Sequence, residues 1–330
     1  MRRLLLLLIL AMAGAMPARV IGQELFSQDE DVIPPEIDHM YVKGIQYLAQ
    51  KQGVSGSWDA PFGNEPAVVG LCMLSILAHG EDPNYGPYSD TVHKALDFIL
   101  KNQSPDTGYI GTSMYNHGFS TLALAEAYGY VHDDRIGPAL QKAVDLILTS
   151  QSHNTSNAWR YSPDSPDADT TVSGAQMVAL FAARNAGIGV PEDAIRKALR
   201  FFADCQTADG GIGYTSPSSP DGARTAIGAL VFSLAKQQKS AAFRAAAGYL
   251  EANPMDEGGY HQYYLYYAAQ AYFRISPEAF DAWNAQNVKA LASTQLDDGS
   301  WNSGLGPTFT TAASLLSLAL NYRLLPIYER

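Results

Sequence analysis

Polar side chains that could bind a ligand or transfer a proton gather in one short stretch of the sequence, residues 159–176 (WRYSPDSPDADTTVSGAQ). Asp167 and Asp169 stand two residues apart, and Thr170 and Thr171 follow just before an apolar helical pattern. A carboxyl group at the start of a helix can exchange a proton or contact a ligand. It can also cap the helix, because Asp-Thr-Thr before an apolar run is a good capping sequence. Both interpretations of Asp169 are open from the residues alone.

Polar residues also open the other apolar helical segments of the chain. Helix N-termini present free N–H groups and the positive end of the helix dipole, so we expect ligand chemistry where these segments begin. The candidates at these places are Asn64 and Glu65; Asn116 and His117; Asp221, Arg224 and Thr225; Tyr260, His261 and Tyr263; and Thr308, Thr310 and Thr311. Of all the candidates, we predict ligand binding by Asp221, Arg224, His261, Tyr260, Tyr263 and Thr170.

A recurring turn separates the helical segments. Gln52 and Gln295 each begin the pattern Q-x-x-x-G-x-W, and variants of it begin at Gln103, Gln151, Gln206 and Asn253. The starts are 51, 48, 55, 47 and 42 residues apart. A fixed period of this length is typical of repeat architectures. We expect the Gln amide to satisfy free backbone groups at the helix ends, the Gly to adopt a positive φ, and the Trp to pack across the corner.

Each period holds two helical patterns of different character. Amphipathic segments precede the turns, with examples at 39–50, 90–102, 137–150, 192–205 and 287–294. Segments that are apolar nearly all round follow the turns, at 65–80, 116–131, 171–187, 224–236, 260–273 and 309–322. A helix that is apolar all round must be buried on all sides. The sequence therefore predicts an all-α fold of six helical hairpins. Because the terminal hairpins are as apolar as the middle ones, we expect a closed (α/α)6 toroid with inner and outer helix rings.

The repeat resembles that of squalene–hopene cyclases and related class II terpene cyclases, and the toroid resembles that of protein prenyltransferase β subunits. The resemblance covers roughly residues 38–330. Class II cyclases carry D-x-D-D-T at the start of an inner helix, and their middle Asp protonates an alkene or epoxide. Asp167-Ala168-Asp169-Thr170-Thr171 matches this motif except that Thr170 replaces the last Asp. The resemblance thus implies Asp169 as a catalytic acid, with Asp167 beside it.

The prenyltransferase resemblance allows a test for zinc. That family binds zinc through an Asp, a Cys two residues later and a His that opens the next inner helix. Asp221 and His261 match the Asp and the His, but Ala223 stands in place of the Cys. A catalytic zinc site usually keeps three protein ligands. We therefore predict no metal and no cofactor.

The ends and the charge of the chain suggest where it acts. Arg2 and Arg3, an apolar run and a small-residue site predict a signal peptide over residues 1–22, followed by a linker over 23–37 and a single toroid domain over 38–330. We expect a secreted or periplasmic protein. The formal charge is −11, and loss of three Arg with the signal peptide makes it −14. An acidic protein is not expected to bind nucleic acid through its overall field.

Three functions fit these features. The first is an enzyme that acts on an isoprenoid-like substrate with Asp169 as acid. The second is a non-catalytic ligand-binding or scaffold toroid. The third is a carbohydrate-active toroid, which needs two carboxylates at a fixed separation, with Glu65, Asp169 and Asp221 as candidates. We expect a small-molecule ligand in the central cavity. The segment Tyr322–Tyr328 could contact a membrane surface or pack as the last helix. The polar residues at the inner-helix starts suggest a cavity wetter than that of a cyclase.

Overall fold

Two kinds of helix alternate along the chain in the computed structural model, which describes residues 33–254 and 261–329. The outer helices are α1 (Pro35–Lys51), α3 (Ser89–Lys101), α5 (Ile136–His153), α7 (Glu192–Asp204), α9 (Ala241–Ala252) and α11 (Pro277–Thr294). The inner helices are α2 (Pro66–Leu77), α4 (Met114–Ala127), α6 (Thr170–Asn185), α8 (Gly222–Leu234), α10 (His261–Ile275) and α12 (Pro307–Leu318). Two short 3-10 helices, η1 (Ala319–Asn321) and η2 (Pro326–Tyr328), follow. The predicted all-α fold is confirmed for these residues.

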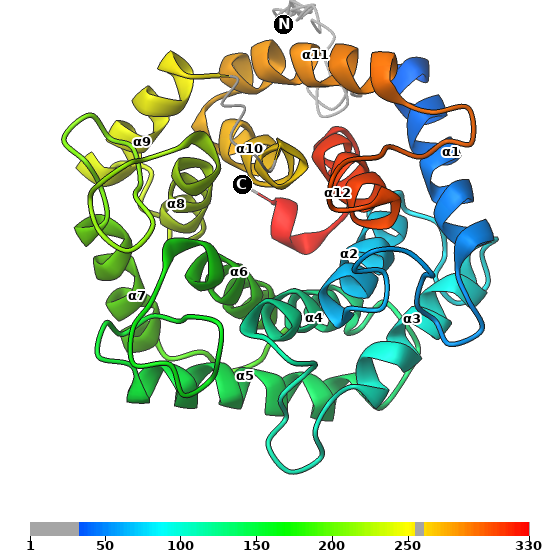
Figure 1. Ribbon diagram of the computed structural model, residues 1–330, viewed down its shortest axis with the longest axis horizontal. Helices are drawn as coiled ribbons and strands as arrows, with labels where there is room; N and C mark the ends of the chain where they lie inside the picture. Colours follow the sequence, from blue (N-terminus) through cyan, green and yellow to red (C-terminus); the bar gives the residue numbers. More distant parts are fainter. Residues whose placement is uncertain (1–32, 255–260, 330) are drawn as a thin grey trace, which may run out of the picture. The chain divides into compact units, whose positions relative to one another are not determined.

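The inner helices form a closed ring within the unit that begins at Ile33 (Figure 1). Each inner helix contacts the next one along the chain, and α12 contacts α2 to complete the ring. The first and last outer helices, α1 and α11, are also in contact. The helices therefore build the predicted (α/α)6 toroid.

Burial follows the two sequence patterns. Every residue of α2 is buried, as its continuous apolar sequence requires. In α7 the buried residues are Ala194, Ile195, Ala198, Leu199, Phe201 and Phe202, which form one face at helical spacing. The charged residues of α7 cover its other face. The inner helices thus form the core, and the outer helices separate it from water.

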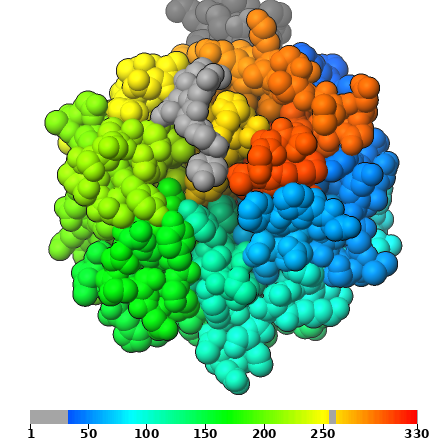
Figure 2. Space-filling view, in the orientation of Figure 1, coloured from blue at the N-terminus to red at the C-terminus, as the bar shows by residue number. Residues whose placement is uncertain are grey.

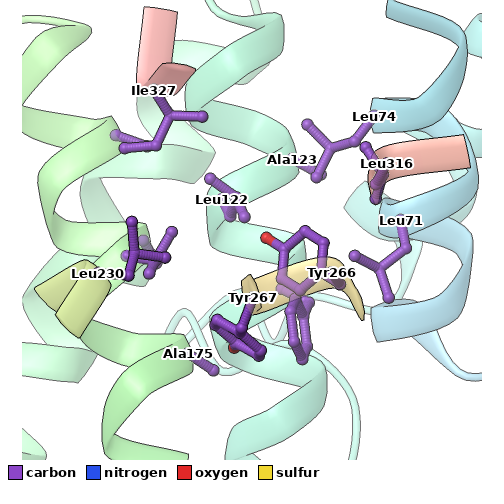
Figure 3. Close-up of a cluster of buried hydrophobic side chains, with 14 of the residues drawn as sticks. Leu71, Leu74, Leu122, Ala123, Ala175, Leu230, Tyr266, Tyr267, Leu316 and Ile327 are labelled. Atoms are coloured by element: carbon purple, nitrogen blue, oxygen red, sulfur yellow. The ribbon is translucent and has the colours of Figure 1, made fainter. Parts of the chain in front are cut away.

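Side chains fill the axis of the inner ring (Figure 3). The cluster there draws on all six inner helices, and its labelled members are Leu71, Leu74, Leu122, Ala123, Ala175, Leu230, Tyr266, Tyr267, Leu316 and Ile327. Ile327 belongs to η2, which contacts α6. Leu325, Ile327 and Tyr328 are all buried, so these side chains of the C-terminal segment pack inside the protein. No helix of the described residues is long and apolar enough to cross a membrane.

The recurring turns form the corners that join each outer helix to the following inner helix. Five glutamines that begin these corners make the same pair of hydrogen bonds. In each, the side-chain amide donates to a carbonyl of its own turn and to a carbonyl in the first turns of the following outer helix. The two acceptors are Gly56 and Thr91 for Gln52, Gly108 and Ala139 for Gln103, Asn157 and Ala194 for Gln151, Gly210 and Ala242 for Gln206, and Gly299 and Met40 for Gln295. The glutamine therefore ties one outer helix to the next, and Gln295 ties the last outer helix to the first.

The corner tryptophans are fixed by their own outer helix. Trp58, Trp159 and Trp301 are each at most 2% exposed. Their indole N–H groups donate to Leu48, Ile147 and Leu291 at 2.8–2.9 Å, ten to twelve residues earlier in the chain. The Trp thus pins the loop after the turn against the helix that precedes it.

Two helix boundaries and one whole helix differ from the expectation. The helix α11 begins at Pro277, ten residues before the predicted segment at 287, because Ser276 caps it by accepting a hydrogen bond from the Ala279 N–H. The outer helix α9 is rich in alanine, and its amphipathic face was not among the predicted examples. The helix α1 begins at Pro35, within the range assigned to the linker. The predicted signal peptide and linker residues 23–32 lie outside the described residues.

Candidate functional site

A cavity of about 720 Å³ opens at the end of the ring where the inner helices begin. We call it the mouth cavity, and it is lined by residues of α2, α4, α6, α8, α10, α12 and of the corners before them. Figure 2 shows this end of the ring, with a depression near its centre that is bordered by the orange-red, blue and green parts of the chain. The volume is in the ~300–1,000 Å³ range of small-molecule pockets. The inner-helix starts do border a cavity, as the sequence predicts.

Most of the lining is aromatic or aliphatic. The rings are Phe62, Tyr115, Phe119, Tyr161, Tyr214, Tyr263, Tyr264 and Phe309, and the aliphatic side chains include Val68, Leu71 and Leu305. The charged lining residues among those described are Glu65, Asp221 and Arg224. The mouth cavity is therefore an apolar hollow with a small number of polar groups.

Asp169 lies behind the wall of this cavity. Its side chain is fully buried and caps α6, where Oδ1 accepts hydrogen bonds from the backbone N–H groups of Thr171 and Val172 at 2.9 and 2.8 Å. The other oxygen, Oδ2, has no hydrogen-bond partner among the described residues and lies 3.9 Å from Nε of Arg160. Burial raises the pKa of Asp169 above its usual range, against the opposing effect of the hydrogen bonds with Thr171 and Val172. The capping interpretation of Asp169 is confirmed.

Two hydroxyl groups connect Asp169 with the mouth cavity. Thr171 Oγ1 donates to Asp169 Oδ1 at 2.6 Å, and Tyr115 Oη donates to Thr171 Oγ1 at 2.7 Å. Tyr115 and Thr171 both line the cavity, whereas Asp169 does not. Burial raises the pKa of Tyr115, so its hydroxyl is neutral near pH 7. A proton exchanged between Asp169 and a bound molecule could pass through the Thr171 hydroxyl, which lines the cavity, either directly or by way of Tyr115.

Arg160 lies between the two predicted aspartates and a pair of tyrosines, Tyr161 and Tyr214, at the rim of the mouth cavity. It forms an ion pair with Asp167, whose side chain is 59% exposed and outside the lining. Its guanidinium lies 5.6 Å from the ring centroids of both Tyr161 and Tyr214. The hydroxyl groups of these two tyrosines hydrogen-bond to each other. The structure thus gives Asp167 the role of a counter-ion for Arg160.

Thr170 is a structural residue of the same corner. It is fully buried, its hydroxyl donates to the Gly213 carbonyl at 2.8 Å, and its N–H donates to the Tyr214 carbonyl at 2.9 Å. It does not line the mouth cavity. Thr170 therefore positions Tyr214 at the rim, and its predicted contact with a ligand would be indirect.

Asp221 and Arg224 form an ion pair at the start of α8. Asp221 caps the helix by accepting from the Arg224 N–H at 2.8 Å, and its Oδ2 lies 2.8 Å from the Arg224 guanidinium. Both side chains line the cavity, as does Ala223. The described residues contain no group of three or more His, Cys, Asp or Glu side chains placed to hold a metal ion.

The predicted residues of α10 divide between the cavity and its surroundings. Tyr263 lines the cavity beside Tyr267, with ring centroids 5.0 Å apart. His261 begins α10 and is half-buried, with its ring 6.5 Å from that of Tyr264, but it is not a lining residue. Tyr260 lies outside the described residues.

Glu65 and Asn116 form a hydrogen-bonded pair in the cavity lining, and neither was among the residues that we predicted to bind a ligand. Asn116 Nδ2 donates to Glu65 Oε2 at 2.6 Å, and both side chains line the mouth cavity. The neighbouring His117 is buried between the Ile110 N–H and the Ala143 carbonyl, and burial lowers its pKa to about 4. His117 is therefore a neutral corner residue.

The rim and wall aromatics were also missing from the predicted site. Tyr161 and Tyr214 stand in the corners before α6 and α8, and Tyr115 and Phe309 stand in the first turn of α4 and α12. Their shared place at the inner-helix starts is a signal that the sequence contains. The prediction of the site gave more weight to the Thr and Asp residues at the same positions, because they are more numerous.

The two concentric helix rings and the cavity at their N-terminal end define an α/α toroid protein. Within that class, the chain belongs to the family described as a domain of unknown function, DUF6288, whose model matches residues 38–292. The family description itself states no activity.

Solved structures with the same fold include two kinds of enzyme and a protein described without an activity. A type II terpene cyclase from Scytonema, in complex with merosterolic acid A (product), has a TM-score of 0.61 and 14% identity, covering 88% of this chain and 98% of that one. An α-1,6-mannanase from Salegentibacter sp. HEL1_6, in complex with α-1,6-mannotriose, has a TM-score of 0.64 and 9% identity, covering 87% and 99%. A protein from Actinoplanes has a TM-score of 0.55 and 16% identity, covering 87% and 99%. At these identities the likeness shows the fold alone.

Proposed function

We propose that the protein binds an elongated, mostly apolar small molecule of the isoprenoid class in the mouth cavity. The observation that carries this proposal is the lining, in which eight aromatic rings and several aliphatic side chains surround about 720 Å³. Burial of apolar ligand surface against such walls is the main source of affinity in small-molecule pockets. The protein would be exported with residues 1–22 as its signal peptide and act in the periplasm or outside the cell.

Most hydroxyl groups at the inner-helix starts form hydrogen bonds within the corners and do not face the cavity. This arrangement supports the proposal of an apolar ligand. Thr225 Oγ1 accepts from the Ile212 N–H and donates to the Asp221 carbonyl. Ser173 and Thr311 accept from the backbone N–H groups of Trp159 and Trp301 at 3.0 Å. These side chains are buried and do not line the cavity. The cavity is therefore drier than the sequence suggested.

A neighbour of the same fold accommodates a ligand of this kind. The Scytonema terpene cyclase has been solved in complex with geranylgeranyl dihydroxybenzoate (substrate), at a TM-score of 0.59. That ligand joins a long apolar chain to a polar ring. By analogy of fold, the mouth cavity would hold the apolar chain among its rings and leave the polar end at the rim.

A carbohydrate is the second candidate, and one observation favours it. Two carboxylates, Glu65 and Asp221, line the cavity from the positions just before α2 and α8. A pair of carboxylates is what glycoside hydrolysis needs. Asp221 is committed to an ion pair and a helix cap, so only Glu65 would have a carboxylate oxygen ready for such chemistry. The isoprenoid proposal accounts for more of the lining.

Geranylgeraniol is expected to bind the purified protein with one molecule per chain. Replacement of Phe309 by alanine is expected to weaken this binding by about tenfold or more, because burial of one Phe ring is worth roughly 1.5–3 kcal/mol. Phe309 lines the cavity and is only half-buried, so the fold should tolerate its loss. Isothermal titration calorimetry measures both affinities. Tyr85→Ala is the control, because Tyr85 is 83% exposed and does not line the cavity. Binding of α-1,6-mannotriose without binding of geranylgeraniol would contradict the proposal.

As a catalytic acid, protonated Asp169 would donate its proton to Thr171 Oγ1, and Thr171 would pass its own hydroxyl proton to the isoprenoid or to Tyr115, which would pass on its own. The two hydroxyl groups would then donate away from Asp169, the reverse of the hydrogen bonds in the structure. Protonation of an alkene followed by loss of a different proton gives an isomer, and in D2O that isomer carries one deuterium. Mass spectrometry of geranylgeraniol recovered from D2O should show the deuterated isomer with the native protein and not with Asp169→Asn. Asn keeps an Oδ1 acceptor for the cap, so the variant should remain folded. Equal deuteration by both proteins would remove Asp169 from the chemistry.

A further inference from the structure

The four carboxylates nearest the mouth of the ring are not equivalent. Asp167 and Asp221 each form an ion pair with an arginine. Asp169 caps a helix and lies behind the cavity wall. Glu65 alone in this group lines the cavity without a cation within 4 Å among the described residues. Its one hydrogen-bond partner there is the Asn116 amide, which contacts Oε2 and leaves Oε1 for a ligand.

Asn116 fixes the position of this carboxylate. Its side chain is 3% exposed, and its Oδ1 accepts from the Ala67 N–H at 3.1 Å. Because Oδ1 is held by α2, Nδ2 must point to Glu65, which it reaches at 2.6 Å. Gly111 packs so closely that an added Cβ would lie 2.6 Å from the Asn116 Cβ. The corner before α4 thus holds the Glu65–Asn116 pair in place before any ligand arrives.

The charge of the lining also favours a cation. Glu65 and Asp221 contribute two negative charges and Arg224 one positive charge, so the described lining carries a net charge of −1. Asp221 and the Ser219 carbonyl both contact Nη2 of Arg224, at 2.8 and 2.6 Å, whereas Nε of the same guanidinium has no hydrogen-bond partner among the described residues. The aromatic rings that surround the cavity attract positive charge by their faces. An anionic group placed beside Glu65 would be repelled, because no Lys, Arg or His side chain of the described residues lies within 4 Å of that carboxylate.

We propose that Glu65, braced by Asn116, selects a ligand whose polar end is a positively charged amine and excludes ligands with an anionic end such as a phosphate. The amine would donate a charge-assisted hydrogen bond to Glu65 Oε1 and stack against the nearby rings. This inference rests on the proposed function for the apolar body of the ligand, but the charge selection can be measured separately.

The test uses two pairs of probes on the purified protein. Benzylamine and benzylphosphonate share a short aromatic body, and geranylgeranylamine and geranylgeranyl phosphate share a long one. Ligand-observed NMR measures the weak short probes and calorimetry the long ones. We expect each amine to bind about tenfold or more tightly than its anionic counterpart. Glu65→Gln should weaken each amine by about tenfold while the affinity for neutral geranylgeraniol stays within about threefold.

The matched control is Glu251→Gln, which changes the net charge of the chain by the same amount at an exposed site on α9. It should leave all affinities unchanged. Glu65→Gln keeps an oxygen that can accept from Asn116, so its thermal unfolding should match that of the native protein. Equal binding of benzylamine and benzylphosphonate, or an equal affinity for benzylamine in Glu65→Gln, would overturn the role of Glu65. Loss of binding for all geranylgeranyl probes, with benzylamine still selected, would instead contradict the isoprenoid proposal and leave Glu65 in place.

Discussion

Replacement of Gly210 by alanine is expected to destabilise the protein by roughly 4 kcal/mol, the sum of backbone strain and a steric clash. Gly210 has a φ of +93°, and a Cβ built on it would lie 2.1 Å from the backbone oxygen of Ala245 in α9. That oxygen belongs to helix backbone, so it cannot move aside cheaply. Urea unfolding followed by circular dichroism gives the change in unfolding free energy.

Gly187→Ala separates the two causes. Gly187 has a similar φ of +87°, but no atom lies within 4 Å of its added Cβ. This variant should lose only the strain contribution, roughly 1–2 kcal/mol. A loss in Gly210→Ala no larger than in Gly187→Ala would show that α9 is not held tightly against the corner. Gly56, Gly108 and Gly299 make the same close approach to the next outer helix.

The stability of the protein is expected to fall as the pH rises from about 5 to about 8, because of a buried glutamate. Glu126 on α4 is 3% exposed, and burial raises its pKa from 4.5 to about 8. The folded protein therefore keeps this proton over a pH range in which the unfolded chain releases it. Where the folded state binds more protons, stability falls with rising pH. At about 1.4 kcal/mol for each pKa unit, the loss is on the order of 5 kcal/mol above pH 8.

The groups around Glu126 explain why its charge is not stabilised. The Ile327 N–H approaches Glu126 Oε2 at 3.4 Å, which is a weak hydrogen bond, and Glu329 adds a like charge. Arg274 is committed to the carbonyl groups of Ile327 and Glu329. Tyr266 and Tyr328 complete the surroundings, and burial raises the pKa of both above the normal range of tyrosine.

Glu126→Gln tests this dependence. Gln keeps an acceptor for the Ile327 N–H but carries no proton to release. The variant should match the native protein near pH 5 and exceed its unfolding free energy by several kcal/mol at pH 9, with urea unfolding measured at each pH. Glu251→Gln, at an exposed position, should follow the native curve throughout. Parallel curves for the native protein and Glu126→Gln would refute the assigned pKa.

The corners show which features of the fold can be predicted from local sequence patterns. The regular return of Gln, Gly and Trp, together with two helix types in each period, predicted the toroid that the structure shows. Capping could be predicted at Asp169 and Asp221, because a cap depends on the next three residues only. The amide of Gln295 was expected to satisfy free backbone groups, but its partner Met40 lies 255 residues away. Only the closed ring brings those two residues together.

The candidate site was harder to predict because it depends on which way each side chain at an inner-helix start turns. Thr170 and Asp169 turn into the corner, whereas Tyr115 and Glu65 turn into the cavity. The sequence places all four at helix starts without distinguishing them.

By itself, the sequence determined the helix types, their order and the end of the ring where the polar residues of the inner-helix starts gather, since each follows from residues close together in the chain. The tertiary structure decided which polar groups would form hydrogen bonds within the corners. It also decided which polar groups would line the mouth cavity. It also placed Glu126 beside the C-terminal segment, with no counter-ion among the residues that the structure describes. These outcomes depend on contacts between helices far apart in the sequence, and such contacts set burial and hydrogen bonding residue by residue.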